Sequence, residues 1–572
     1  MRIPPAFLVA CALGLASAPP LLAQPSGART SLVPADLVVR HAAIWTVDAK
    51  RPRAEALAVL GGEIVAIGSE ADIAPRIGPN TRVIDAKGRT VLPGFTDTHV
   101  HFLSGALGLT RADLEGAKDV TELRTRLTAY RASHPGTSWV LGRGWNYAMF
   151  GAEALPNKKY LDDLFPDRPV FLSGYDGHTS WVNSKALALA GITRATPDPA
   201  NGAIVRDANG DATGALKEKA SGLVSKLVPA PSRAEQVQAL VAGMQLAATL
   251  GVTRVHSAGG DFEVLPLLDS LRQAGKLTLR FEIGYRLEPP ALRPADLTAI
   301  EEARARYTGD WVSGGLVKLM IDGVIESHTA AMLGPYTDQP NTSGSMFWEP
   351  KAFAEAVKVL DGKGLRLMTH AIGELGVRTV LDAYAAAATA NGARDRRHRV
   401  EHIETIAASD IARFGKDGVI AGMQPLHAYP DVNTTDVWAR NIGPERASRA
   451  WVWKRIRSAG GRLAFGSDWP VVTLNPWPGV QVGVTRQTED GRPKGGFVPS
   501  ERLSVAEMIA GYTLGAAVAA GRERREGSLA MGKVADFIVL ARDPFTASPK
   551  QLAEMRVAMT VVGGKVVVEE RR

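Results

Sequence analysis

Histidines and one carboxylate in this chain have the types and spacing of metal ligands. His99 and His101 are separated by one residue, and His370, His402 and Asp468 follow much later. Because side chains alternate faces along a strand, an H-x-H on a strand puts both imidazoles on one side. A single histidine is more often a surface or satisfied core residue. The five together predict a nitrogen and oxygen ligand set for divalent metal.

Lys318 is the unusual candidate, because an ammonium group cannot bind a metal. Burial lowers the pKa of a lysine, and the neutral amine can add carbon dioxide. The resulting carbamate is an oxygen ligand able to bridge two metal ions. The alternative is a structural salt bridge, for example to the nearby Asp322, and spacing alone favours that alternative.

The combined set predicts two divalent metal ions. Zinc is the default for histidine and carboxylate ligands, although manganese, cobalt, nickel and iron are compatible with the same ligands. In this interpretation Asp468 both binds a metal and acts as the catalytic base, passing a proton from a metal-bound water to the leaving group.

The elements that carry these residues are short apolar strands that alternate with helical segments. The strand candidates are Phe95–His101, Val252–His256, Arg280–Tyr285, Leu316–Ile321, Leu365–Thr369, Val400–Ile403, Val419–Met423 and Leu463–Gly466. Capping boxes predict helix starts at Ser232 and Ser504. Eight alternations predict an α/β fold, a (β/α)8 TIM-type barrel with an insertion of about 102–245 after the first strand. Each candidate ligand then falls at the C-terminal end of a strand, where barrels of this type place their active sites.

Both ends of the chain have a different texture, of short β-rich runs broken by glycine. Neither end has enough strands for a core of its own. We therefore expect residues 36–92 and 525–572 to pair into one small β-sandwich domain, with the barrel spanning 93–524.

The N-terminus resembles a secretory signal peptide over residues 1–23, followed by a polar linker at 24–35. The apolar stretch is too short to span a membrane, so no stable membrane insertion is expected. The only cysteine, Cys11, lies inside this segment. Its surroundings match a lipoprotein cleavage pattern weakly, and removal of the segment would leave no thiol. The expected location is the periplasm or the medium.

Composition excludes some partners. Hydrophobic residues make up 45% and charged residues 22% of the chain, which is ordinary for a globular protein. The net charge of +8 is spread along the chain without a basic block, so no nucleic-acid partner is expected. The expected partner is a small-molecule substrate, and a homo-oligomer is left open.

Several further residues are candidates for the substrate pocket. His178 could hold a substrate carbonyl or its oxyanion, or could be a loop histidine that bonds to backbone. His328 could orient the carbamate or contact substrate. Trp145 and Trp181 lie among loop aromatics that favour an apolar pocket, unless they pack the insertion onto the barrel. His256 and His427, near the ends of the second and seventh strands, could face the same mouth.

These residues lie in motifs that resemble the amidohydrolase superfamily, and specifically its YtcJ-like (amidohydrolase type 3) branch. The resemblance covers nearly everything after the signal segment. The motifs are Leu92-Pro93-Gly94-Phe95-Thr96-Asp97-Thr98-His99-Val100-His101, Asp176-Gly177-His178-Thr179-Ser180-Trp181-Val182-Asn183-Ser184, Val317-Lys318-Leu319-Met320-Ile321-Asp322-Gly323, Thr369-His370-Ala371-Ile372-Gly373, Val400-Glu401-His402, Gly466-Ser467-Asp468-Trp469-Pro470 and Gly532-Lys533-Val534-Ala535-Asp536.

The resemblance implies a binuclear metal set made of His99, His101, carboxylated Lys318, His370, His402 and Asp468. Three departures from the family pattern, at Asn146, Ser257 and Glu374, concern the pocket and remove no ligand.

The predicted function is that of an exported metal-dependent hydrolase of carbon–nitrogen bonds other than peptide bonds. By resemblance, the substrate is an N-substituted formamide, an N-acyl amine or an amino-acid amide, cleaved by a metal-bound hydroxide. The same site could hydrolyse a lactone, ester or cyclic amide, or deaminate a ring. A non-catalytic regulatory or binding protein on the same fold is a further alternative, against which the complete ligand set argues.

Overall fold

The computed structural model describes residues 33–145, 149–150, 155–174, 179–199 and 202–570. The predicted signal peptide with Cys11, most of the linker and His178 lie outside the described residues.

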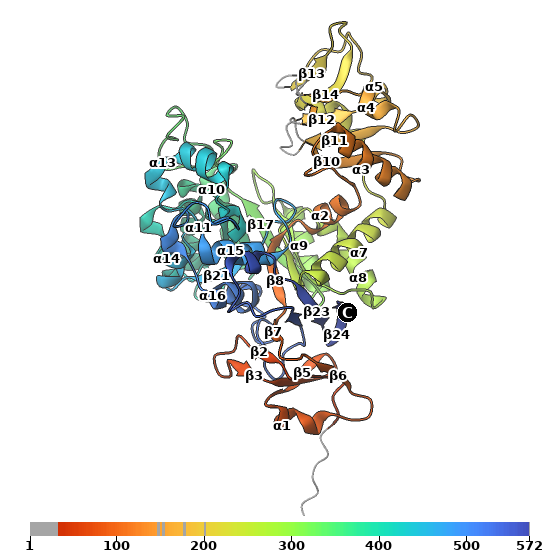
Figure 1. Cartoon of the computed structure of the whole chain (residues 1–572). Coiled ribbons are helices and arrows are strands. Elements are labelled where there is room, and N and C mark those ends of the chain that lie inside the picture. The colour runs from red at the N-terminus through yellow and green to blue at the C-terminus, as the bar shows by residue number, and fades with distance from the viewer. Residues whose placement is uncertain (1–32, 146–148, 151–154, 175–178, 200–201, 571–572) are drawn as a thin grey trace, which may run out of the picture.

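The centre of the molecule is a sheet of eight parallel strands, which confirms the predicted barrel (Figure 1). Each predicted strand is present, with its bounds shifted by a few residues at most. The strands are β8 (Phe95–Val100), β15 (Val252–Ser257), β16 (Arg280–Arg286), β17 (Val312–Met320), β18 (Arg366–Ala371), β19 (Arg399–His402), β20 (Ile420–Met423) and β21 (Arg462–Phe465).

The two edge strands, β8 and β21, are joined by backbone hydrogen bonds just past their ends. The amide of Asp468 donates to the carbonyl of His99 at 2.7 Å, and the amide of His101 donates to that of Trp469 at 2.7 Å. These two hydrogen bonds therefore close the barrel and also position His99, His101 and Asp468.

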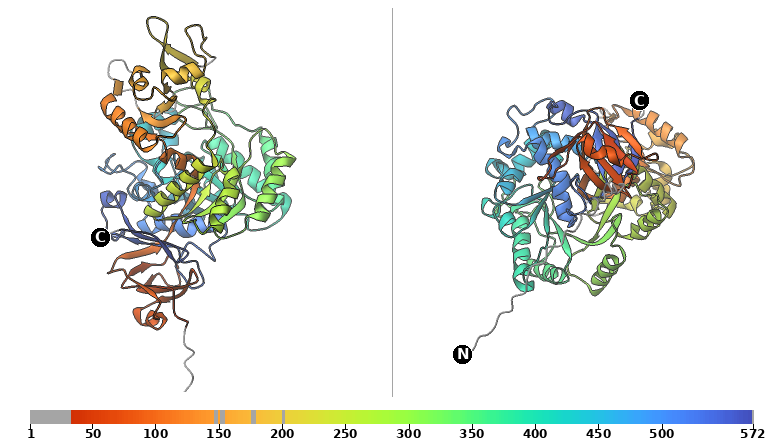
Figure 2. Two further views of the ribbon diagram at one scale, coloured as in Figure 1. Left: turned by 90° about the vertical axis from the view of Figure 1, so that its right-hand side faces the viewer. Right: turned by 90° about the horizontal axis from the view of Figure 1, so that it is seen from below.

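Helices surround the barrel (Figure 2), and buried apolar residues of the strands and helices form one core. α7 and α16 begin at the predicted capping boxes, where Ser232 pairs with Glu235 and Ser504 with Glu507. The helices of the barrel are α2 (Phe102–Leu109), α7 (Arg233–Thr249), α8 (Leu265–Gln273), α9 (Pro294–Arg306), α10 (Pro350–Gly362), α11 (Glu374–Asn391), α12 (Arg413–Lys416), α13 (Ala439–Ala447), α14 (Trp453–Ser458), α15 (Pro476–Thr485), α16 (Val505–Ala510) and α17 (Ala516–Ala520). Among the described residues, no helix is long and apolar enough to cross a membrane.

The two ends of the chain meet in a β domain below the barrel, as the fold prediction requires (Figure 1). One sheet has the order β5-β4-β1-β6, and the other the order β24-β23-β22-β7-β2-β3. In the second sheet, Leu92 of β7 is opposite Ile538 of β22. The strands are β1 (Leu37–Arg40), β2 (Ala43–Trp45), β3 (Arg53–Ala54), β4 (Ala56–Leu60), β5 (Glu63–Gly68), β6 (Arg82–Asp85), β7 (Thr90–Pro93), β22 (Phe537–Leu540), β23 (Val557–Val562) and β24 (Lys565–Glu569), with helices α1 (Glu70–Ile73) and α18 (Pro549–Ala553).

The insertion after the first strand forms a separate six-stranded sheet with its own hydrophobic clusters. In Figure 1 it projects from the barrel on the side opposite the β domain. Its elements are β9 (Ala112–Asp113), α3 (Val120–Ser133), β10 (Val140–Trp145), α4 (Lys159–Asp162), β11 (Val170–Gly174), β12 (Thr179–Val182), α5 (Ser184–Leu189), β13 (Gly202–Arg206), β14 (Ala212–Glu218) and α6 (Gly222–Ser225). α2 and α7, at the edges of the expected range, pack on each other, since Gly243 lies against Phe102 and Ala106.

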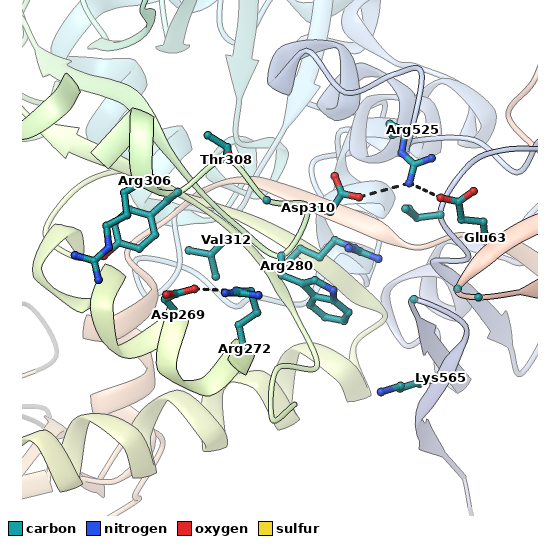
Figure 3. Close-up of a pocket in the computed structure, with 17 residues that line it drawn as sticks. Glu63, Asp269, Arg272, Arg280, Arg306, Thr308, Asp310, Val312, Arg525 and Lys565 are labelled. Atoms are coloured by element: carbon teal, nitrogen blue, oxygen red, sulfur yellow. Dashed lines mark hydrogen bonds and ion pairs between the residues drawn. The ribbon is translucent and has the colours of Figure 1, made fainter. Parts of the chain in front are cut away.

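A cavity of about 660 Å³ lies between the β domain and the N-terminal ends of the barrel strands (Figure 3). Most of its charges are paired within the protein. Arg280 binds Asp536 at 2.6 Å, and Arg525 lies 2.7 Å from Glu63 and 3.5 Å from Asp310. These contacts link the two domains, and the predicted site lies at the other end of the barrel.

Candidate metal centre

The six predicted ligands meet at the C-terminal mouth of the barrel. His99 is on β8 and His101 directly follows that strand, while Lys318, His370 and His402 lie on β17, β18 and β19, and Asp468 follows β21. All but His101 are buried.

Distances between ligand atoms show how closely these side chains approach each other. The Nε2 atom of His99 lies 3.0 Å from Lys318 Nζ and 3.5 Å from Asp468 Oδ1. The Nε2 atom of His101 lies 3.2 Å from the same carboxylate oxygen. The His402 ring is 4.8 Å from that of His99 and 4.4 Å from that of His370, centroid to centroid. Separate parts of the chain thus contribute to one compact group.

This group has the properties of a metal site. His99, His402 and Asp468 each offer a ligand atom, and these atoms lie within 4.8 Å of one another. The Nδ1 atom of His402 is buried and has no hydrogen-bond partner among the described residues. Leaving a buried polar atom unpaired costs about 1–3 kcal/mol. A divalent ion would satisfy this nitrogen, so the residues fit a metal.

Burial keeps the basic ligands in the form that binds metal. It lowers the pKa of His370 to about 4, helped by the charge of Lys318, and holds the pKa values of His99 and His402 well below their ordinary value. Burial also lowers the pKa of Lys318 to about 8. Metal ligation requires neutral imidazoles, and carbamate formation requires a neutral amine.

The carboxylate of Asp468 is held in its ionised form. Burial disfavours the charge, but His99 and His101 outweigh it, so the pKa of Asp468 lies well below its ordinary value. The side chain is therefore available as an anionic metal ligand.

Glu401 belongs to the site, although the sequence did not identify it. Its carboxylate is fully buried, and Oε2 accepts a hydrogen bond from His99 Nδ1 at 2.8 Å. This bond fixes the His99 tautomer and leaves Nε2 free for a metal. The other oxygen, Oε1, lies 3.2 Å from Arg399 Nε, which balances the buried charge.

Backbone geometry explains why Glu401 was missed. Adjacent residues on a regular strand face opposite sides, so strand alternation alone would not bring Glu401 and His402 to one site. His402 has φ 74° and Ile403 φ 51°, which ends the strand alternation at that point. Asp468 also has a positive φ, of 64°. Such conformations are costly for residues other than glycine and concentrate at functional sites. A glutamate directly before a strand-ending histidine is the signal that could have identified it.

Asp322 supports the site through the backbone and does not pair with Lys318 in the described contacts. Its carboxylate accepts hydrogen bonds from the amides of Ala331, Ile372 and Gly373 at 2.9 to 3.0 Å. These bonds tie together the segments that follow β17 and β18, the strands that carry Lys318 and His370.

Four other predicted pocket residues lie away from the ligands. Trp145 and Trp181 are fully buried in the core of the insertion, where their rings meet edge to face at 6.3 Å. They pack the insertion, because each indole is enclosed by that core, and neither lines the cavity above the ligands. His328 binds Asp338 at 3.0 Å and lies against Tyr336. His256 lies inside the barrel, 3.2 Å from Arg399.

His427 does reach the mouth. Its ring stacks on that of His402 at 6.0 Å, and Nε2 lies 4.0 Å from Asp468 Oδ2. A cavity of about 720 Å³ opens above these residues and is also lined by His370. This volume suits a small-molecule ligand.

A model of the amidohydrolase family matches residues 82–568. The chain is 32% identical to the putative amidohydrolase YtcJ of Bacillus subtilis, covering 92% of this chain and 98% of the relative. It is 28% identical to the N-substituted formamide deformylase of Arthrobacter pascens, covering 92% and 97%. A solved metal-dependent hydrolase from Pyrococcus furiosus matches with a TM-score of 0.71 and 26% identity, covering 89% of this chain and 100% of that one.

The barrel and the buried ligand group define a hydrolase of the metal-dependent class. More particularly, the chain belongs to the amidohydrolase family, which confirms the resemblance inferred from its motifs.

Proposed function

We propose that the protein hydrolyses a carbon–nitrogen amide-type bond in a small molecule, with an N-substituted formamide, an N-acyl amine or an amino-acid amide as substrate. The observation that carries this proposal is the meeting of buried ligand atoms of His99, His402 and Asp468 within 4.8 Å of one another, beside a cavity that His402 and Asp468 line. The similarity to a formamide deformylase over 92% of the chain supports the choice of bond.

The metal ligands we propose are His99, His101, His370, His402, Asp468 and Lys318 as its carbamate. Zinc is the metal this ligand set suits first, and the carbamate allows two ions. When bound, divalent metal supplies Lewis acidity and lowers the pKa of water.

The protein's own residues then position and transfer protons. Glu401 holds His99 in the tautomer that keeps Nε2 free. Asp468 accepts the proton of the attacking water and returns it to the departing nitrogen, a role that its position in the lining of the cavity supports. His427, whose Nε2 lies 4.0 Å from Asp468 Oδ2, would hold the substrate carbonyl.

We also propose that the protein is exported to the periplasm or the medium. The support is the signal-like sequence of residues 1–23, which precedes the described residues. Measuring the N-terminus of the mature protein in cell fractions tests this: a chain that begins near residue 24 outside the cytoplasm supports export, and an intact N-terminus in the cytoplasm contradicts it.

The proposed activity is tested by removing metal with a chelator, restoring zinc, and assaying a panel of formamides, N-acyl amines, amino-acid amides, esters and lactones. We expect turnover of at least one amide that disappears on chelation and returns with metal. Turnover of esters or lactones alone would show that the enzyme cleaves a carbon–oxygen bond and not the proposed amide bond. Purified protein with no bound metal would contradict the proposal.

A further inference from the structure

The cavity above the ligands has a strongly one-sided charge. Besides Asp468 it is lined by Glu326, Glu404, Asp431 and Glu489, and no lysine or arginine is among its lining residues. The whole chain carries a net charge of +8, so this wall departs from the general surface. Clefts lined by charges of one sign raise the local concentration of ligands of the opposite sign.

These carboxylates are not compensated by nearby cations. No lysine or arginine forms an ion pair with Glu326, Asp431 or Glu489 in the part of the chain that the structure describes. Glu489 instead accepts a hydrogen bond from Tyr429 at 2.5 Å, and Asp431 from the amide of Thr434 at 2.9 Å. Elsewhere in the protein, acidic groups such as Glu282 and Glu526 are paired with arginine.

Glu404 brings a further carboxyl group into the cavity. Burial and the neighbouring Glu326 raise its pKa well above its ordinary value, and a cationic ligand beside it would favour its ionised form. Its side chain is only 9% exposed, and Oε2 accepts a hydrogen bond from Trp438 Nε1 at 2.7 Å. No described residue donates a hydrogen bond to Oε1, and the nearby His427 Nδ1 is 3.9 Å away. A buried oxygen acceptor with one free side, facing a cavity, is a binding position for a donor on a ligand.

Aromatic rings complete the wall. Tyr429 and Trp451 line the same cavity, and Trp451 stacks on Trp438 at 4.7 Å between ring centroids. Aromatic faces beside carboxylates attract organic cations, because the ring quadrupole adds to the charge interaction.

We propose that the substrate of this site carries a positively charged group, such as an ammonium or guanidinium, at the end away from the bond that is cleaved. Glu404 binds this group inside the cavity, and Glu326, Asp431 and Glu489 attract it at the rim. This inference rests on the proposed amide hydrolysis and adds the charge of the substrate to it.

The test uses metal-loaded full-length protein and two formamides of similar length, cationic N-(5-aminopentyl)formamide and neutral N-hexylformamide. We expect kcat/KM for the cationic compound to exceed that for the neutral one at least tenfold, and the ratio to fall as salt rises. Equal values, or a preference for the neutral compound, would overturn the inference while leaving amide hydrolysis intact.

If neither formamide is hydrolysed, formamides are not the amides that this site cleaves, and charge selectivity is measured by binding alone. Calorimetric titration then compares choline with its neutral isostere 3,3-dimethylbutan-1-ol, neither of which contains an amide. Tighter binding of choline supports the inference, and equal or weaker binding overturns it.

Substitutions in the cavity test which carboxyl groups produce the preference for the cationic substrate. Glu404→Gln should reduce the cationic preference about tenfold, about 1.4 kcal/mol. Glu489→Gln, an exposed change with little risk to folding, should reduce it severalfold. Glu355→Gln, on the exposed face of α10, is the matched control and should leave the ratio unchanged. An unchanged ratio in both cavity variants would overturn the inference.

Discussion

Replacing Glu401 with glutamine should weaken metal binding without removing any metal ligand. The Glu401 carboxylate accepts the His99 Nδ1 hydrogen bond at 2.8 Å in a fully buried position. Glutamine has nearly the same shape but no charge, and its amide group can turn a donor toward Nδ1. His99 would then lose the partner that keeps Nε2 free and electron-rich.

The size of the effect follows from this bond. Hydrogen bonds to charged groups contribute about 1.5–3 kcal/mol, and changes to such supporting partners typically cost about 10–100-fold in metal affinity or activity. We therefore expect zinc affinity to fall about 10–100-fold. Stability should also fall, by about 3–5 kcal/mol, because the buried Arg399 loses its counter-charge at 3.2 Å.

The assay is a competition titration of zinc against a chelator of known affinity, with unfolding followed in parallel. Glu282→Gln is the matched control, because Glu282 is equally buried and paired with Arg366 but contacts no predicted ligand. It should lose stability and keep wild-type zinc affinity. The reasoning would be refuted if Glu401→Gln bound zinc as tightly as wild type, or if Glu282→Gln weakened zinc to the same extent.

Three further predictions concern Asp468, Lys318 and the insertion. Asp468→Asn should lower kcat by about 10²–10⁴ while metal stays bound, as measured by turnover and metal analysis; unchanged turnover would exclude Asp468 as the base. Because the pKa of Lys318 is lowered to about 8, half of this amine is neutral at about pH 8 in the metal-free protein. At the same pH, less than about 1% of an ordinary lysine would be neutral. Carbamate formation, followed by carbon-13 NMR with labelled bicarbonate, should therefore rise up to about pH 8 and then level off, and a rise that continued to pH 10 would show an ordinary lysine. Trp181→Ala should destabilise the insertion by about 3–5 kcal/mol, seen as earlier denaturant unfolding with unchanged zinc content, and loss of zinc without loss of stability would connect Trp181 to the site.

The barrel was predictable because its signals are local. Each strand is a short apolar run between helix signals. α7 starts directly after its N-cap residue Ser232 and ends shortly before Gly251, whose φ is 77°, and the sequence indicates both limits. The pairing of the two chain ends followed from a shortage of strands at each end. Such features depend on patterns within a few residues or on simple strand counts.

The surroundings of the ligands were less predictable, because they depend on the direction of side chains after folding. The spacing of His99 and His101 on one strand was informative, and both lie near Asp468. Glu401 and His402 contact the same site because the positive φ of His402 interrupts the strand alternation, which residue spacing alone does not show. Trp145 and Trp181 have the composition of a pocket, but the insertion has enough apolar residues to enclose them in its own core.

The most direct test of the central claim is an anomalous-scattering map from crystals of the zinc-loaded protein, recorded at the zinc edge. The account predicts anomalous density among His99, His101, His370, His402 and Asp468, with ordinary density continuing beyond the Nζ atom of Lys318. A map without an anomalous peak at this position would contradict the account.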